Sequence, residues 1–347
     1  MMDAAAEITA LWDDYRPTTL IELPDLARRA GIGRVFLKNE SERPFGNFKA
    51  LGGMVAGLRA LGRAAGVTVR ELISTQSTRR SLPRLICASD GNHGLSVAAA
   101  AKRAGTKACI YLPVGVSRAR AERIEGFGAQ IMWINGTYDD AVDAAMAAAG
   151  RGDGLLIPDT SADPNDAVVK DVMDGYALLT RELAIQFRDE AKDRPSHVFV
   201  QAGVGGLAAA VAQGLADTMR APGKLLVVEP LAAACVARAL AVGHTERIPG
   251  DLHTAAEMLS CGVASVPALE ILRRHDARSV QVDEEQLQSA VAVLQAAGGP
   301  ATTPSGAAGV AGLVHVAARP ELRSAHQLGA DSSVLVIVTE GPVSAQG

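Results

Sequence analysis

The sequence predicts an α/β protein built on open parallel sheets. Short β-rich runs alternate along the chain with Ala-rich helical runs, which is the order that parallel α/β folds show. Several of the β-rich runs are continuously apolar, as is typical of strands that are covered on both faces. The 347 residues are enough for about two domains of ordinary size.

The predicted elements follow one another in order. Strands are predicted at residues 34–38, 85–88, 107–112, 130–134, 197–200, 225–228 and 334–338. Helices are predicted at 93–104, 117–127, 139–149, 169–189, 207–219 and 284–297. Polar or Gly/Pro-rich breaks fall at 74–83, 150–154, 191–196 and 298–306, and the first of these is predicted to be an exposed loop or a mobile flap. Ligands of parallel sheets bind at the carboxyl ends of the strands, so functional residues are expected in the loops there.

The composition excludes several classes of protein. Hydrophobic residues make up 48% of the chain and charged residues 21%, which excludes an intrinsically disordered chain. Only 3% of the residues are aromatic, which argues against base stacking as a main activity. The 34 Lys and Arg residues against 38 Asp and Glu give a net charge of −4, so no nucleic-acid partner is expected.

The cysteine pattern predicts neither a metal site nor a disulfide framework. The four cysteines are far apart and form no CxxC pair or Cys/His cluster: Cys87, Cys109, Cys235 and Cys261. We expect them to be reduced. The first residues lack the basic and apolar regions of a signal peptide, and no run of ~20 apolar residues is present. A cytoplasmic protein without a membrane partner is therefore expected.

A glycine-rich loop follows one of the predicted strands. Gly203-Val204-Gly205-Gly206 comes after the strand that begins at His197 and precedes an Ala-rich helix. Glycines allow backbone N–H groups to approach an anion closely, and the start of a helix adds partial positive charge. The loop lacks the Lys-Ser/Thr pair of a P-loop and the complete dinucleotide fingerprint. It is therefore either a phosphate site or a tight turn that packs the helix on the sheet.

Two further segments carry residues that suit chemistry on an amino acid. Lys49 lies in the run Asn47–Gly53, and a lysine amine can form a Schiff base with a carbonyl compound, although most lysines are surface residues. The loop Ser89-Asp90-Gly91-Asn92-His93-Gly94 follows an apolar strand and opens a helix. Its N–H groups suit a substrate carboxylate. Asp90 and His93 also have plain interpretations, as a helix N-terminal acid and a capping histidine.

Together these segments resemble the fold-type II pyridoxal-phosphate (PLP) enzymes. In detail they are most similar to the diaminopropionate ammonia-lyase family, within the superfamily of threonine and serine dehydratases. The matching motifs span nearly the whole chain in the expected order: Tyr15-Arg16-Pro17-Thr18-Thr19-Leu20, Val35–Ser41, Phe48–Gly53, Asp90–Gly94, Pro158-Asp159-Thr160, Glu229-Pro230, Cys261-Gly262, Ser305-Gly306 and Thr339-Glu340-Gly341.

The resemblance implies a fold and a cofactor site. The fold is a tryptophan synthase β-like pair of open parallel-sheet α/β domains, with residues 1–52 and 152–347 in the large domain and 53–151 in the small one. Lys49 carries the PLP as a Schiff base, and its freed amine serves as base or acid at Cα. The other implied cofactor contacts are Phe48 beside the ring, Asn92 at the ring hydroxyl, Thr339 at the pyridine nitrogen, and Gly203, Val204, Gly205 and Gly206 around the phosphate. No metal is implied.

The resemblance also implies a reaction. Ser89, Asp90 and His93 would contact the amino-acid substrate, and Asp90 and Asp159 would take part in proton transfer. A β-amino leaving group must be protonated and held, which two carboxylates can do, and the counterpart of Asp159 is linked to use of the D-isomer. The implied function is α,β-elimination of ammonia from 2,3-diaminopropionate, giving pyruvate and ammonia through aminoacrylate. A homodimer is implied as well.

Three departures from the family keep the substrate open. They are Thr19 in the entry motif, Glu257 ahead of Cys261, and Thr303-Pro304 ahead of Ser305. Asp159 can also be a turn residue, and Thr339 can merely end a strand. The alternatives are a threonine/serine dehydratase, another lyase or β-replacement synthase acting on a β-substituted amino acid, and a PLP-bound regulatory protein without turnover.

Overall fold

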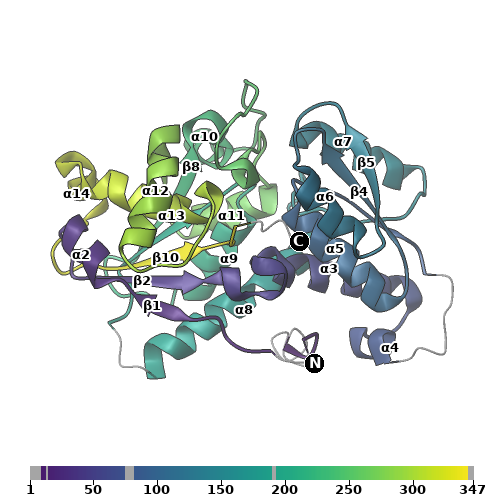
Figure 1. Cartoon of the computed structure of the whole chain (residues 1–347), viewed down its shortest axis with the longest axis horizontal. Coiled ribbons are helices and arrows are strands. Elements are labelled where there is room, and N and C mark those ends of the chain that lie inside the picture. The colour runs from purple at the N-terminus through teal and green to yellow at the C-terminus, as the bar shows by residue number, and fades with distance from the viewer. Residues whose placement is uncertain (1–8, 13–14, 75–81, 190–192, 343–347) are drawn as a thin grey trace. The chain divides into compact units, whose positions relative to one another are not determined.

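The computed structural model describes residues 9–12, 15–74, 82–189 and 193–342, and it divides the chain into two compact units. Unit 1 comprises Met1–Arg16, Lys49–Leu178 and Val343–Gly347, and unit 2 comprises Pro17–Phe48 and Leu179–Pro342. Each unit contains one open sheet (Figure 1). The division falls between Phe48 and Lys49 and again within a long helix.

Unit 2 is built on a six-stranded sheet in the order β1-β2-β10-β7-β8-β9. Its strands are β1 (Leu20–Glu22), β2 (Arg34–Asn39), β7 (His197–Gln201), β8 (Lys224–Pro230), β9 (Arg278–Val282) and β10 (Ser333–Val338). β1 pairs antiparallel with β2, and every other pair is parallel. The sheet therefore presents the carboxyl ends of β7, β8 and β10 at one edge, where the loops that follow them lie together.

One face of this sheet packs on three helices, α2 (Pro24–Ala30), α12 (Glu284–Ala296) and α13 (Pro304–Ala317). Alternate strand residues, such as Phe199, Val228 and Val336, meet Leu313 and Leu294 of these helices in one buried core. Alternation of this kind follows from the two-residue repeat of a strand. The remaining helices of unit 2 are α9 (Gly206–Leu215), α10 (Cys235–Val242), α11 (Val266–Arg274) and α14 (Pro320–His326).

A buried charge network lies against the other face of β2. The Lys38 ammonium and the Arg43 guanidinium each lie 2.7 Å from Glu182 of α8 (Ala167–Asp189), and Arg43 also contacts Glu40 at 2.7 Å. All four side chains are at most 3% exposed. Burial of unpaired charges is costly, so the four groups are stable here only as a set. The network ties the segment just ahead of Lys49 to helix α8.

Unit 1 is built on a four-stranded parallel sheet in the order β5-β4-β3-β6. The strands are β3 (Leu85–Ala88), β4 (Ala108–Pro113), β5 (Gln130–Ile134) and β6 (Leu155–Leu156). The helices are α3 (Lys49–Ala65), α4 (Val69–Ser74), α5 (Asn92–Ala104), α6 (Arg118–Glu125) and α7 (Tyr138–Gly150), together with α8 as far as Leu178. Helices α3 and α5 approach closely, because a Cβ on Gly53 would lie 2.8 Å from the Ser96 Cβ.

The predicted fold class is confirmed, with two open, mainly parallel sheets and all seven predicted strands present. The short strands β1 and β6 and the edge strand β9 are additional. The four cysteines are buried free thiols. The predicted domain limits stay a prediction; the compact units change at Lys49 and after Leu178. Of the predicted loop at 74–83, residues 75–81 lie outside the described part of the chain.

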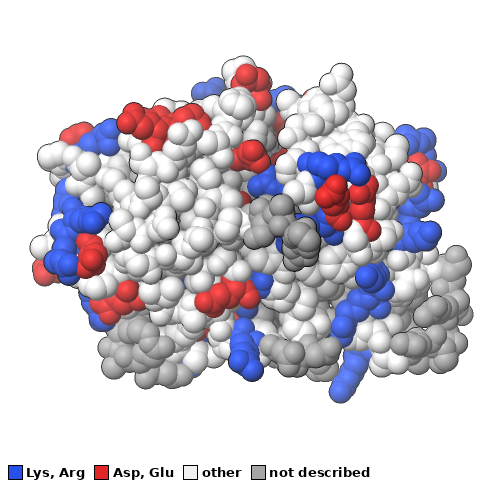
Figure 2. Space-filling model, in the orientation of Figure 1, with Lys and Arg blue, Asp and Glu red and all other residues white. Residues whose placement is uncertain are grey.

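Two surface properties bear on partners. In the described part of the chain, no helix combines the length and the apolar character needed to cross a membrane. Basic and acidic side chains are interspersed over the face shown in Figure 2.

The buried network in unit 2 predicts a large stability difference between two glutamate substitutions. Glu182→Ala leaves Lys38 and Arg43 short of a buried counter-charge, so the free energy of unfolding should fall by about 3–5 kcal/mol. Glu22→Ala removes an exposed pair with Arg34 and should cost at most about 1 kcal/mol. Urea unfolding curves of both variants measure the difference. Equal, small effects would show that the network contributes little.

Candidate active site

In unit 1, Lys49 and Asp159 form an ion pair. Lys49 is the first residue of α3, and its ammonium contacts Asp159 Oδ2. The Tyr138 hydroxyl, from the first residue of α7, donates to the other carboxylate oxygen, Oδ1, at 2.5 Å. The side chain of Asp159 is 8% exposed and that of Lys49 is 20% exposed. A cation at the positive end of a helix is disfavoured, and the Asp159 carboxylate offsets this.

The two aspartates of this site have opposite pKa shifts. Burial alone would raise the pKa of Asp159, but the Lys49 ammonium and the hydrogen bond from Tyr138 bring that pKa well below its usual range. Burial, followed by the negative charge of Asp159, raises the pKa of Asp90 to about 8, and Lys49 and Arg120 offset this only in part. At neutral pH, Asp159 is therefore ionised and Asp90 holds a proton. Two neighbouring carboxyl groups whose pKa values are shifted in opposite directions can serve as an acid and a base in one site.

The other residues of the 89–94 loop shape the start of α5. Ser89 Oγ accepts hydrogen bonds from the N–H groups of Gly91 and Gly94, both at 2.8 Å, so its hydroxyl is used within the loop. His93 is buried, and its Nε2 lies 2.8 Å from the Ile157 carbonyl oxygen. Because a carbonyl only accepts, Nε2 carries the hydrogen there. Burial lowers the pKa of His93, so the ring is neutral and tethers the loop to the segment that ends in Asp159.

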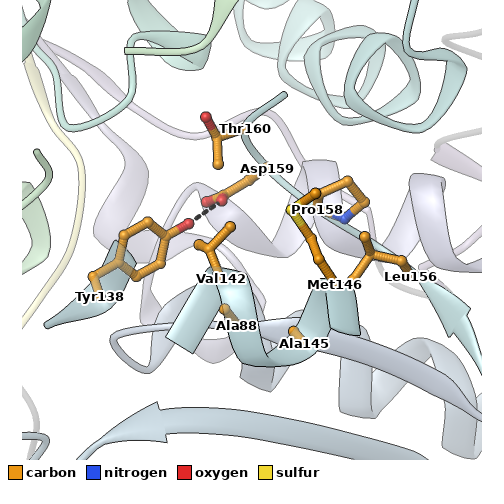
Figure 3. A pocket seen from close by; sticks show the side chains of 9 residues that line it. All are labelled: Ala88, Tyr138, Val142, Ala145, Met146, Leu156, Pro158, Asp159 and Thr160. Atoms are coloured by element: carbon orange, nitrogen blue, oxygen red, sulfur yellow. Dashed lines mark hydrogen bonds between the residues drawn. The ribbon is translucent and has the colours of Figure 1, made fainter. Parts of the chain in front are cut away.

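A small pocket opens beside Asp159 (Figure 3). Its wall is mostly apolar, with the Tyr138–Asp159 hydrogen bond at one end. The lining residues come from β3, α7 and the 156–160 segment: Ala88, Tyr138, Val142, Ala145, Met146, Leu156, Pro158, Asp159 and Thr160. The empty volume of about 230 Å³ is below that of typical ligand pockets, so this space suits at most a small group beside Asp159.

In unit 2, the glycine loop is shaped to hold an anion. β7 ends at Gln201, α9 begins at Gly206, and Gly205 between them has the left-handed φ of 97° that favours glycine. A Cβ on Gly203 would lie 2.9 Å from the Cys261 Sγ, so only glycine fits. Within the described residues, the N–H groups of Gly203, Val204 and Gly205 make no hydrogen bond. Free N–H groups at a helix start suit a phosphate.

Thr339 and Phe48 lie beside the end of β10 in the same unit. The Phe48 N–H donates to the Thr339 carbonyl oxygen at 3.0 Å. Thr339 is buried, with 4% of the residue exposed. Its hydroxyl oxygen accepts a hydrogen bond from Gln201 Nε2 at 3.0 Å. Lys49 follows Phe48 directly in the sequence.

A family model described as "Pyridoxal-phosphate dependent enzyme" matches residues 11–340 of the chain. The chain belongs to the pyridoxal-phosphate dependent enzymes. The residues present fit this cofactor. They are a lysine able to form a Schiff base, a glycine loop with no room for a Cβ at Gly203, and the buried Thr339 hydroxyl near that loop. The predicted cofactor and the predicted family are thereby confirmed.

The chain is similar to several known proteins, of which three are described here. Diaminopropionate ammonia-lyase of Escherichia coli K12 is 33% identical over 341 residues, which covers 94% of this chain and 85% of the relative. The crystal structure of the Escherichia coli enzyme with an aminoacrylate-PLP azomethine reaction intermediate has a TM-score of 0.85 at 31% identity, covering 98% and 88% of the two chains. A serine dehydratase-like protein of Mus musculus is 28% identical, covering 84% and 79%.

The structure brings some of the predicted site residues together within each unit. Lys49 and Asp159 touch in unit 1, and the charges of both act on Asp90. Asn92, also in unit 1, is the first residue of α5 and is buried. Phe48, Thr339 and the glycine loop belong to unit 2.

Sequence reasoning missed three polar residues of these sites. Tyr138 bonds Asp159, Tyr176 of α8 interacts with Lys49, and Gln201 bonds Thr339. Burial raises the pKa of Tyr176 to about 12. A signal existed for two of them: Tyr138 opens the helix that follows β5, and Gln201 is the polar last residue of an apolar strand. Both positions lie at strand carboxyl ends, where ligands bind.

The three departures from the family pattern have local structural explanations or surface positions. Thr303 caps α13, because its Oγ1 accepts from the Gly306 N–H at 3.0 Å and donates to Glu340 Oε1 at 2.5 Å, and Pro304 fits the first helical position. Thr19 Oγ1 donates to Glu42 Oε1 at 2.7 Å. Glu257 is exposed at the start of a short 3₁₀ turn.

The raised pKa of Asp90 predicts a pH-dependent stability. Between the unfolded pKa near 3.8 and the folded pKa of about 8, the folded chain keeps a proton that the unfolded chain releases, so stability falls as pH rises. Asp90→Asn removes this loss. Urea unfolding of the cofactor-free protein measures the free energy of unfolding at pH 5 and pH 8. Its decrease between these two pH values should be smaller in the variant than in the wild type by more than about 1 kcal/mol. An unchanged pH dependence would contradict the assignment.

The glycine cradle predicts a selective loss of cofactor affinity. Gly203→Ala places a methyl group against the Cys261 sulfur, so the loop must shift, and the dissociation constant for PLP should rise about tenfold or more. Gly329→Ala, in open space of the same unit, should bind PLP normally. Equilibrium dialysis against PLP measures both. Normal binding by the first variant would place the phosphate elsewhere.

Proposed function

We propose that this PLP-dependent enzyme eliminates ammonia from 2,3-diaminopropionate, giving aminoacrylate, which water then hydrolyses to pyruvate and a second ammonia. The observation that carries the proposal is the pair of carboxyl groups beside Lys49, one ionised and one protonated at neutral pH. The similarity to diaminopropionate ammonia-lyase over 94% of this chain supports it.

We propose the following cofactor contacts. Lys49 would carry PLP covalently, the N–H groups of the 203–206 loop would hold its phosphate, and Asn92 would bond its ring hydroxyl. Phe48 would pack beside the ring, and Thr339 would face the ring nitrogen. When bound, the cofactor supplies an electron sink for the negative charge that develops at the substrate Cα.

The chain's own residues would handle the substrate's charges and protons. Asp159, which accepts a hydrogen bond from Tyr138, would attract the second ammonium group of a diamino acid, and that charge would take the place of the Lys49 ammonium once Lys49 carries the cofactor. The Lys49 amine, once released from the cofactor, accepts the Cα proton. The β-ammonium group already carries the proton with which it leaves as ammonia, so in this proposal the protonated Asp90 carboxyl serves as a hydrogen-bond donor to the substrate. His93 is neutral and tethered to Ile157, so in this proposal it orients the loop that carries Asp90.

A second candidate is dehydration of serine or threonine. The protonated Asp90 carboxyl supports it, because a hydroxyl leaving group requires a proton from an acid. The similarity to the mouse serine dehydratase-like protein is lower, at 28% identity, and a hydroxy acid gives the ionised Asp159 no ammonium to bind. A β-replacement synthase differs from both in that an added nucleophile such as sulfide would increase turnover.

We also propose that the enzyme acts as a homodimer in the cytoplasm, on the strength of the family resemblance. Sedimentation of the purified protein tests the assembly.

A substrate panel tests the reaction. Pyruvate release from D- and L-2,3-diaminopropionate, D- and L-serine and L-threonine is followed with lactate dehydrogenase. Because a charge-assisted hydrogen bond is worth about 1.5–3 kcal/mol, kcat/KM for diaminopropionate should exceed that for serine by about 10- to 100-fold. A preference for a hydroxy acid would defeat the ammonia-lyase proposal but not the cofactor assignment.

Lys49→Ala in the same panel should abolish both turnover and the absorbance of the Schiff base. Lys102→Ala, an exposed lysine in the same unit, should leave both unchanged. Turnover by the Lys49 variant would contradict its proposed role.

A further inference from the structure

The Gln201 side chain connects three elements of unit 2. It lies at the end of β7, on the α13 side of the sheet with Phe199. Its Nε2 lies 2.9 Å from the Gly306 carbonyl oxygen and 3.1 Å from those of Ser305 and Ile337. The fourth neighbour is the Thr339 Oγ1, at 3.0 Å. The side chain is buried, with 2% of the residue exposed.

This environment fixes which end of the amide faces Thr339. Three of the four neighbours are carbonyl oxygens, which only accept hydrogen bonds. The amide nitrogen must therefore point toward them, and the Thr339 hydroxyl oxygen accepts a hydrogen bond from it.

A hydroxyl that accepts from the amide keeps its own proton for another partner. Within the described residues, the Thr339 hydroxyl donates to no acceptor. Thr339 is 4% exposed, so water access to this proton is limited. A buried donor without an acceptor is costly, which indicates that a bound group completes the site.

We propose that Gln201 is a positioning residue that directs the Thr339 hydroxyl to donate its proton to the ring nitrogen of bound PLP. The inference rests on the proposed place of Thr339 at that nitrogen. The direction of the bond matters chemically. A hydroxyl that donates fits an unprotonated ring nitrogen, whereas a hydroxyl whose proton was taken by a neighbouring acceptor would offer the nitrogen only a lone pair. Gln201 thereby selects the less electron-withdrawing form of the cofactor.

The test compares PLP with an analogue whose ring nitrogen is replaced by C–H. Equilibrium dialysis against the cofactor-free enzyme gives both dissociation constants, and their ratio isolates the hydrogen bond at the nitrogen. The wild-type chain should bind the analogue about tenfold more weakly. Thr339→Val should bring the ratio to about one, and Thr339→Ser, which keeps the hydroxyl, should restore most of it.

Gln201→Met is the decisive variant, because it removes the amide at similar volume. The freed Thr339 hydroxyl can then turn toward other acceptors, and the ratio should fall to about threefold or less. Gln186→Met removes another glutamine of unit 2, which bonds the Thr18 carbonyl oxygen at 2.9 Å, and should keep the tenfold ratio. If Gln201→Met does not fold, Gln201→Asn replaces it, since the shorter amide cannot reach the same four oxygens.

The outcomes separate this inference from the proposed function. A full tenfold ratio in the Gln201 variant would overturn the positioning role, and so would a wild-type ratio near one. Either result is compatible with ammonia-lyase activity. Failure of the wild-type chain to form pyruvate from diaminopropionate would instead overturn the proposed substrate and leave the binding ratio interpretable.

Discussion

The contact between the Lys49 ammonium and the Asp159 carboxylate lowers the pKa of Asp159 and, through the charge of Asp159, helps to raise the pKa of Asp90. It holds Asp159 as an anion in a nearly buried position, where a lone carboxyl group would take up a proton. The charge of Asp159 then adds to burial in keeping Asp90 protonated. Two carboxyl groups of the same chemical type therefore differ in protonation because only one of them has a cation in contact with it.

Unit 2 depends on a geometrical constraint. β7 and β10 are parallel neighbours, with Val334 paired to His197 and Val336 to Phe199. Their carboxyl ends must then lie side by side, which brings Gln201 and the glycine loop next to Thr339, although Gln201 and Thr339 are 138 positions apart in the sequence. Helix α13 supplies the carbonyl oxygens that fix the Gln201 amide. The positions of the glycine loop and of the Thr339 hydroxyl beside it are thus products of one strand pairing.

The apolar strands could be predicted from the sequence because their signal is local. β3 and β5 begin and end at the predicted residues. β9 (Arg278–Val282) lies at the sheet edge and carries Arg278 and Gln281 on its exposed positions, so its run is not continuously apolar. Lys49 and Asp159 could be singled out through motifs, but their contact spans 110 positions and depends on how α3 packs. Tyr138 and Gln201 belong to no motif; their positions after strands mark them as candidates, but their partners Asp159 and Thr339 come from long-range packing.

The distribution of charge is matched to an elimination in the proposed reaction. In the proposed site, the group that faces the cofactor ring nitrogen is a neutral hydroxyl, so little of the negative charge that develops at Cα can be stored in the ring. The β-substituent must then leave soon after the Cα proton is removed, so that the electron pair at Cα forms the new double bond. Asp159 would offer a negative charge to a β-ammonium group, and the protonated Asp90 would donate a hydrogen bond to the substrate. A cofactor that stores little charge, together with a leaving group that the protein binds, favours elimination over reactions that need a long-lived negative charge at Cα.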